Sequence, residues 1–414
     1  MNNLIIKNAS QVVTCSGNKG KHGKEMSDLH VIDDGTVIVT DGIITQVLKA
    51  GVTIPVNEND YEVIHAEGKA LLPGFVDPHT HFIFGGYREE EFSWRMRGDS
   101  YMSIMERGGG IVNTTKATRD AAENELYELG KQRLDAMMKF GITTVEGKSG
   151  YGLDKETELK QLRVMKQLNQ SHPMDIVSTF MGAHAVPAEW KGREDAFVNF
   201  NINELFSVVA KEELAECVDI FCEKNVFTIE QSRRYLTAAR KYGFKLKIHA
   251  DEIVSFGGAE LAAELKVLSA DHLLQASDEG IRAMAQSGVI ATLLPLTAFS
   301  LREDYARGRE MIDNNCVVAL ATDLNPGSSF TSSVPLLFAL ACIYMHLSVE
   351  ESITAFTINS AAAIDRADCI GSIDVGKQGD LILLQFPSYK FLPYHIGMNL
   401  VETVIKKGNI IINN

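Results

Sequence analysis

The feature that most constrains the fold is a regular alternation of short apolar stretches and longer helical stretches through the middle of the chain. The helical stretches, such as residues 117–140 and 228–243, carry helical spacing of apolar residues and end near glycine. The apolar stretches are "LLPGFVDPHTH", "GITTVEGKSG", "DIVSTFMGAH", "CVDIFCE", "KLKIHADE", "LSADHL", "VIATLLP" and "VVALATD". Eight β-α units over roughly 300 residues predict a (β/α)8 barrel, whose active site lies at the carboxyl ends of the strands. A doubly wound sheet is the alternative α/β fold, but no G-x-G-x-x-G motif follows an early strand.

Both ends of the chain differ from this middle. Short runs with β character, separated by glycine and aspartate, fill residues 1–70, and the same texture returns in residues 366–414. We therefore expect an α/β protein in which residues 71–365 form a TIM-like barrel. The two ends are expected to meet and build one small β-sandwich domain.

Polar side chains gather where the predicted strands end. In chain order these are His79 and His81, then His184, then His249 followed by Asp251 and Glu252, then Asp271 with His272, and finally Asp323. Side chains alternate faces along a strand, so His79 and His81 point the same way. One histidine at such a position is more often a packed core residue than a ligand. A whole set at one rim of a barrel indicates a functional site.

Three imidazoles and one carboxylate suit a borderline metal such as zinc or iron better than calcium or magnesium. The predicted ligands are His79, His81, His249 and Asp323. Asp323 is equally suited to orient a bound water. A second ion would need a bridging ligand from the fourth strand, commonly a modified lysine, whereas "CVDIFCEKN" ends in Glu223 with Lys224 on the opposite face. We therefore predict one zinc or iron ion per chain.

Several loop motifs carry a more specific likeness. They are "PGFVDPHTH", "HFIFGGYREEEF", "GGGI", "EGKSGYGL", "GAHAVP", "KIHADE", "SADHL", "ATDLNPGSS" and "GKQGDLILL". Together they resemble the metal-dependent amidohydrolase superfamily and, within it, the imidazolonepropionase family of histidine degradation. The likeness runs from about residue 65 to the C-terminus. One departure is Gly147, where that family usually has a β-branched residue.

The resemblance implies hydrolysis of 4-imidazolone-5-propanoate to N-formimino-L-glutamate by attack of a metal-activated water on the ring amide. That reaction needs a base for the water and an acid for the leaving ring nitrogen. The implied catalytic residues are Asp323, His272 and Glu252, and Glu252 is also an implied ring contact. Which of them acts as base and which as acid stays open. Without its "HADE" context, Glu252 would be interpreted as a surface carboxylate.

The resemblance also implies the residues that bind the substrate. Arg88 is expected to bind the propionate, since a guanidinium binds a carboxylate in a forked geometry. The alternative for Arg88 is a solvated arginine beside Glu89–Glu91. The remaining implied contacts are Tyr151, His184, Asn325, Gly327 and Ser328. Glycine at 327 would let the backbone approach the ligand closely.

The composition of the chain limits the kinds of binding partner that we expect. The 414-residue chain has a formal net charge of −14, which argues against nucleic acid or an anionic membrane as its main partner. Its six cysteines form no C-x-x-C pair, and the N-terminus has no apolar signal segment, so we expect a cytoplasmic protein with reduced thiols. A homodimer is expected from the resemblance. The alternative functions are another amidohydrolase, such as a nucleobase aminohydrolase or dihydropyrimidinase-like ring opener, and a non-catalytic scaffold, which would lack metal ligands.

Overall fold

The computed structural model describes residues 3–99 and 109–413. Gly108, the first glycine of the "GGGI" motif, lies outside the described residues. Eight parallel strands follow one another around a barrel in chain order, as predicted. They are β6 (Phe75–Asp77), β7 (Ile142–Lys148), β8 (Asp175–Ala183), β9 (Cys217–Cys222), β10 (Lys245–Ala250), β11 (Ser269–His272), β12 (Ile290–Leu293) and β13 (Val317–Leu320). Each coincides with one of the apolar stretches seen in the sequence.

The barrel closes just beyond the ends of its first and last strands. Thr80 and Leu324 form a parallel bridge there. The backbone amide of Asp323 donates to the carbonyl of His79 at 3.0 Å, and that of His81 donates to Leu324 at 2.8 Å. These bonds fix two predicted ligand segments side by side, although more than 240 residues separate them in the chain.

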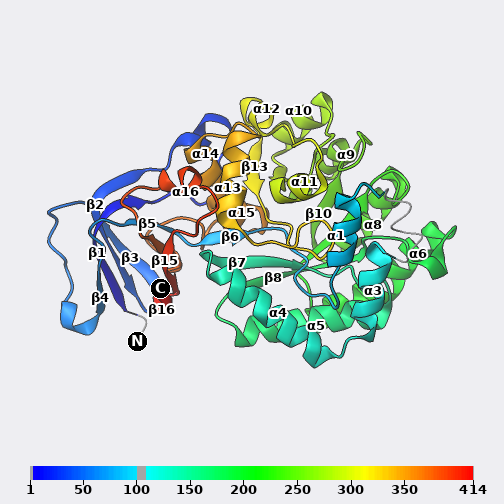
Figure 1. The fold of residues 1–414 in the computed structure, drawn as a ribbon, viewed down its shortest axis with the longest axis horizontal. Coiled ribbons are helices and arrows are strands. Elements are labelled where there is room, and N and C mark those ends of the chain that lie inside the picture. Colours follow the sequence, from blue (N-terminus) through cyan, green and yellow to red (C-terminus); the bar gives the residue numbers. More distant parts are fainter. Residues whose placement is uncertain (1–2, 100–108, 414) are drawn as a thin grey trace.

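Helices surround the barrel (Figure 1). They are α1 (Glu89–Met96), α3 (Ile111–Asp120), α4 (Glu123–Met138), α5 (Lys155–Ser171), α6 (Glu194–Phe200), α7 (Phe206–Lys211), α8 (Ile229–Lys241), α9 (Gly258–Leu265), α10 (Asp278–Ser287), α11 (Pro295–Leu301), α12 (Gly308–Asp313), α13 (Val334–Ile343), α14 (Val349–Ala355), α15 (Ile358–Ala363) and α16 (Phe391–Tyr394). Several begin at a side chain that caps free backbone amides, as Thr228 does in a capping box with Gln231. α10 is capped at its start by Ser277 and at its end by Gly288, whose φ of 76° suits glycine. The apolar faces of the helices and the outer faces of the strands form one continuous core.

The second sheet is built from both termini, as predicted. Its strands are β1 (Leu4–Val13), β2 (Val31–Thr40), β3 (Ile43–Leu48), β4 (Glu62–His65), β5 (Ala70–Pro73), β14 (Leu381–Leu384), β15 (Val401–Lys406) and β16 (Asn409–Asn413). The order is β16-β15-β14-β5-β1-β2-β3, with β4 also beside β1, and the sheet is mixed. Figure 1 shows it to one side of the barrel, with both chain ends close together.

Buried contacts join this sheet to the barrel. Lys406 Nζ lies 2.6 Å from Asp380 Oδ2 and 2.8 Å from Asp175 Oδ2, and Asp175 begins barrel strand β8. The backbone amide of Gly74 donates to Asp380 O at 2.8 Å. Across the described ranges, no helix is both long and apolar enough to cross a membrane.

Candidate active site

The predicted ligands meet at the carboxyl ends of the strands. Asp77, the last residue of β6, accepts hydrogen bonds from the amide (3.1 Å) and hydroxyl (2.6 Å) of Thr322, which follows β13. This contact sets His79 and His81 against Asp323. One ligand atom from each of these three residues lies within 4.8 Å of the others. All three side chains are buried.

Two further groups share these histidines. His79, His249 and His272 form one, and His81, His184 and His249 form the other, again with ligand atoms within 4.8 Å. The rings of His79 and His249 lie 4.5 Å apart, and those of His81 and His184 stack at 4.9 Å. The structure therefore brings all five predicted histidines into one cluster. Histidine and aspartate groups placed in this way could hold a metal ion.

Hydrogen bonds orient the imidazoles. His79 Nδ1 pairs with Asp271 Oδ2 at 2.6 Å, His81 Nδ1 with Ser149 O at 3.3 Å, and His184 Nδ1 with Gly150 O at 3.0 Å. A carbonyl or carboxylate oxygen can only accept, so Nδ1 carries the proton in each case and Nε2 keeps its lone pair. Metal-binding histidines are commonly oriented through the second nitrogen in this way.

Burial favours the form of histidine that binds metals. It holds the pKa of His79, His81 and His272 well below the usual range and lowers that of His184 to about 3, with neighbouring positive charges adding to the effect. The rings are therefore neutral near pH 7. His79 Nε2 and His272 Nδ1 are buried with no hydrogen-bond partner among the described residues. Buried, unpartnered lone pairs fit a bound cation.

Two carboxylates in the cluster have different environments. Asp323 Oδ2 accepts from Thr297 Oγ1 at 2.6 Å, and its Oδ1 lies 3.5 Å from His79 Nε2. Glu252 follows β10, and its Oε1 lies 3.6 Å from His272 Nδ1. Burial raises the pKa of Asp323 to about 6, and burial together with the charge of Asp323 raises that of Glu252 to about 8. Near neutral pH one carboxylate is thus ionised and the other protonated, as an acid–base pair requires.

The backbone at two of these residues is in the left-handed region. φ is 74° at His272 and 51° at Asp323. Residues other than glycine adopt such angles at a cost, and they are concentrated at functional sites. The backbone amide of Asp323 donates to His79 O at 3.0 Å, and that of Leu273, next to His272, donates to Ala250 O at 3.1 Å.

Tyr151 and His184 line the same cluster from β7 and β8. The Tyr151 ring lies 5.5 Å from that of His81 and 5.4 Å from that of His184. Burial and the nearby carboxylates of Asp323 and Glu252 raise the pKa of Tyr151. Its hydroxyl therefore remains a hydrogen-bond donor.

The loop after β13 is shaped by Asn325. Its side-chain oxygen accepts from the amides of Gly327 and Ser328, both at 2.8 Å, and its amide group donates to Asp323 O at 2.7 Å. Asn325 is thus placed to fix this turn. A β-carbon at Gly327 would lie 2.1 Å from Nη1 of Arg88, so only glycine allows that approach.

Arg88 precedes α1, and its Nε donates to Glu91 Oε2 at 2.7 Å. Glu91 is buried and also accepts from the amide of Gly110 at 3.0 Å. Arg88 is thus partly buried and held by Glu91, whereas the alternative expected a solvated arginine beside Glu89–Glu91. The terminal nitrogens of the guanidinium face Gly327.

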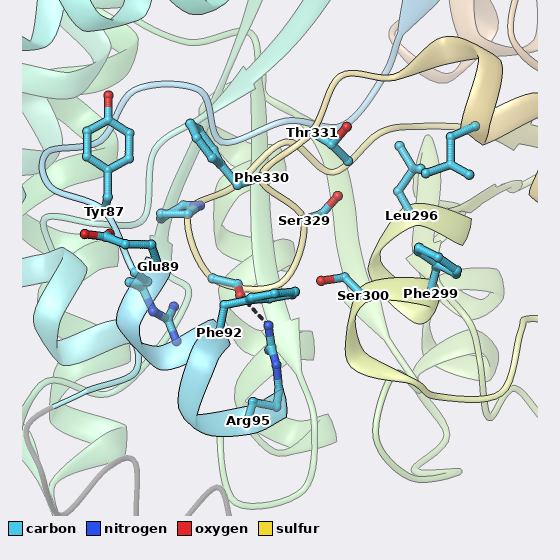
Figure 2. Close-up of a pocket in the computed structure, with 14 residues that line it drawn as sticks. Tyr87, Glu89, Phe92, Arg95, Leu296, Phe299, Ser300, Ser329, Phe330 and Thr331 are labelled. Atoms are coloured by element: carbon cyan, nitrogen blue, oxygen red, sulfur yellow. Dashed lines mark hydrogen bonds between the residues drawn. The ribbon is translucent and has the colours of Figure 1, made fainter. Parts of the chain in front are cut away.

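A cavity of about 560 Å³ opens beside this loop. Figure 2 shows that α1 supplies Phe92 and Arg95, α11 supplies Leu296 and Phe299, and the loop after β13 supplies Ser329 and Phe330. Arg88 and Gly327 also line it, whereas none of the five clustered histidines does. The cavity therefore lies at the Arg88 side of the cluster.

The barrel strands also carry a layer of buried charges that was not predicted from the sequence. Lys148 Nζ lies 2.6 Å from Asp219 Oδ2, 3.1 Å from Glu146 Oε1 and 3.2 Å from Asp271 Oδ2. Lys247 pairs with Glu146, and all five side chains are fully buried. Burial by itself would lower the pKa of Lys148, but Asp219, Glu146 and Asp271 raise it well above its usual value. The available signal was charged residues at alternate positions of otherwise apolar strands, as in "VEGK" and "KLKIHA".

Glu223, which directly follows β9, is buried, and its Oε2 accepts from the amide of Ile253 at 2.8 Å. Lys224 is exposed. Glu223 thus holds the segment that follows β10, next to Glu252.

Comparison with known proteins agrees with this architecture. Residues 70–411 match the model of the amidohydrolase family. The chain belongs to the amidohydrolase family, whose fold and strand-end site were predicted.

Within that family the chain is similar over nearly its whole length to imidazolonepropionases. The protein of that name from Parabacteroides distasonis is 63% identical over 98% of each chain, and the one from Clostridium tetani is 62% identical over 99% of this chain and 98% of its own.

Solved structures show the same fold at low identity. A triazine hydrolase variant superposes with a TM-score of 0.75 at 15% identity, over 100% of this chain and 95% of its own. An adenosine deaminase from Xanthomonas campestris, crystallised with bound zinc, gives 0.70 at 17% identity, over 99% of this chain and 93% of its own.

Proposed function

We propose that this chain hydrolyses 4-imidazolone-5-propanoate to N-formimino-L-glutamate in histidine degradation. The observation that carries the proposal is the convergence of histidines and Asp323 at one barrel rim, in a chain similar over nearly its full length to imidazolonepropionases. Water adds to the ring carbonyl carbon, the cyclic amide C–N bond breaks, and the ring nitrogen leaves with a proton.

We propose one zinc or iron ion, held by His79, His81, His249 and Asp323. When bound, such an ion would lower the pKa of a water molecule and polarise the ring carbonyl. The neutral imidazoles and the unpartnered Nε2 of His79 support this assignment.

The chain supplies the proton transfers. Asp323, ionised near neutral pH, is suited to accept a proton from the attacking water, with His272 as the neighbouring base. Glu252, whose pKa is about 8, is suited to donate a proton to the leaving ring nitrogen and to hydrogen-bond the ring.

We assign substrate binding to the side of the histidine cluster on which Arg88 and the loop after β13 lie. Arg88 would pair with the propionate, because Glu91 fixes its Nε and no residue in the described ranges accepts a hydrogen bond from its terminal nitrogens. Tyr151 would donate a hydrogen bond to the substrate, and Nε2 of His184 would accept one. The turn held by Asn325, with Gly327 and Ser328, would close on the polar end of the ligand.

The test is a spectrophotometric assay of imidazolone propionate consumption, combined with metal analysis, on wild type and His249→Ala. We expect about one ion per chain and turnover in the wild type, and loss of both in the variant. If the protein binds metal and hydrolyses dihydrouracil or a nucleobase but not imidazolone propionate, it is an amidohydrolase with a different substrate, and the proposed substrate is wrong. A wild type that binds neither zinc nor iron would revive the scaffold alternative.

We also propose a cytoplasmic homodimer with a barrel of residues 71–365 and a small domain from residues 1–70 and 366–414. The pairing of β14 with β5 supports this division. All six cysteines are free thiols, which supports a reducing compartment. Exposed apolar side chains at the end of α13, Ile343 and Tyr344, support an interface between copies.

A further inference from the structure

The ammonium group of Lys148 lies one contact away from two of the clustered histidines. It binds Asp219 Oδ2 at 2.6 Å and Asp271 Oδ2 at 3.2 Å. The same Asp271 oxygen is hydrogen-bonded to His79 Nδ1 at 2.6 Å, whereas the same Asp219 oxygen lies 3.1 Å from His249 Nδ1 without hydrogen-bond geometry. One cation thus fixes the two oxygen atoms that face the two imidazoles.

This arrangement has no access to solvent. The side chains of Lys148, Asp219 and Asp271 have no exposed surface, so water cannot replace the ammonium group as a donor. The two carboxylates that share it lie close together, and like charges at short range destabilise each other strongly in a buried site.

We propose that Lys148 is a positioning residue of the metal centre, holding His79 and His249 through Asp271 and Asp219 with Nε2 directed at the ion. The inference rests on the metal centre in the proposed function. Without the ammonium group, the two carboxylates lose the donor that fixes them in place. The imidazole that each carboxylate contacts then loses its fixed orientation, and such partners typically contribute about 10- to 100-fold to metal affinity.

The sign of the effect separates this role from simple electrostatics. Lys148 is a positive charge near the proposed ion, so its removal alone would tighten binding of a cation. Loss of orientation weakens binding instead. A weaker complex therefore identifies positioning.

The experiment measures the dissociation constant of zinc from apoprotein, by competition with a chromophoric chelator, in wild type and Lys148→Met. We expect the variant to bind zinc about 10- to 100-fold more weakly. With saturating zinc, its KM for substrate should equal that of the wild type. Unchanged or tighter zinc binding overturns the proposal, as does a second zinc per chain with the first unaffected.

Lys406→Met is the matched control. Lys406 is also a buried lysine bound to two aspartates, Asp380 and Asp175, but it lies in the terminal sheet. The Lys406→Met variant should have a lower free energy of unfolding than the wild type and bind zinc with the wild-type affinity. If Lys406→Met weakens zinc binding as much as Lys148→Met does, the effect is general destabilisation and the proposal fails.

Two more variants keep the test decisive. If Lys148→Met does not fold, Lys148→Gln, which retains a donor for one carboxylate, is measured in the same way. In an Asp219→Asn background, Lys148→Met should weaken zinc binding less than it does in the wild type, because one route is already lost. If the effects of the two substitutions on zinc-binding free energy are fully additive, the proposal is overturned. If the wild type binds no zinc, the proposed metal centre itself is wrong.

Discussion

Thr297 Oγ1 donates a 2.6 Å hydrogen bond to Oδ2 of Asp323, which leaves Oδ1 of the same carboxylate 3.5 Å from His79 Nε2. The hydroxyl thus decides which oxygen faces the histidines. Thr297 itself is buried on α11 and is not one of the clustered titratable groups.

Replacing Thr297 with valine should therefore impair the site without removing any predicted ligand. We expect Thr297→Val to lower kcat/KM about 10- to 100-fold, the usual effect of losing a partner of a metal ligand. Thr297→Ser keeps the hydroxyl and should retain most activity. Equal losses in the two variants would assign the effect to packing of the methyl group.

Glu252→Gln should remove the proton donor and leave the metal content unchanged. We expect kcat to fall about 100- to 10,000-fold, the usual contribution of a general acid. Because the protonated carboxyl is the active form and its pKa is about 8, wild-type kcat should fall as pH rises beyond that value. Residual activity of the variant should lack this alkaline limb. Glu303→Gln, an exposed neighbour, is the control and should keep the wild-type kcat, with its alkaline limb moved slightly to lower pH because the charge of Glu303 helps to raise the pKa of Glu252.

Arg88 should affect substrate affinity more than turnover. Loss of a charged hydrogen-bond pair is worth about 1.5–3 kcal/mol, so Arg88→Met should raise KM roughly 10- to 150-fold. Gly327→Ala places a β-carbon against the Arg88 guanidinium and should raise KM in the same direction. An unchanged KM in Arg88→Met, measured with zinc saturating, would remove the propionate assignment.

The metal-free protein should lose stability as pH rises. Burial raises the pKa of Asp77 from its ordinary 3.8 to about 7, so the folded state binds this proton more tightly than the unfolded state. The stabilisation is complete below about pH 4 and is lost as pH rises through about 7; it is on the order of 4 kcal/mol.

Asp77→Asn cannot titrate, so its melting temperature should depend less on pH over this range. Thermal unfolding of the chelator-treated wild type and variant between pH 5 and 8 measures the difference. Parallel curves for the two proteins would show that Asp77 does not carry a raised pKa.

The order of strands and helices was predictable from the sequence because the spacing of apolar residues within a short segment reflects how that segment is buried. A parallel barrel strand is covered on both faces, so its residues form a short apolar run, as "VVAL" and "IATL" do. Charged residues that follow such runs must emerge at the same rim. His79, His249 and Asp323 could therefore be grouped from the sequence alone.

The buried charges could not be placed in the same way. Lys148 stands before "SGYG", where a lysine ordinarily faces solvent, and only the register of β7 against its neighbours turns it inward. Its partners, Asp219 and Asp271, come from two other strands, and no short sequence pattern links the three. The role of Glu91 in holding Arg88 was missed for a related reason, since it is one of three consecutive glutamates and only one of them is buried.

Because the terminal sheet contains strands from both ends of the chain, it can be completed only after the whole barrel has been synthesised. β5 pairs with β14, and about 300 residues separate them, so at roughly 5–20 residues per second the ribosome needs about 15–60 s between the two. During that time one edge of β5 carries unpaired backbone groups while the barrel folds beside it. The last strands to leave the ribosome pair with this edge. A chain truncated before Leu381 therefore exposes an unpaired edge strand and becomes a substrate for chaperones and proteases.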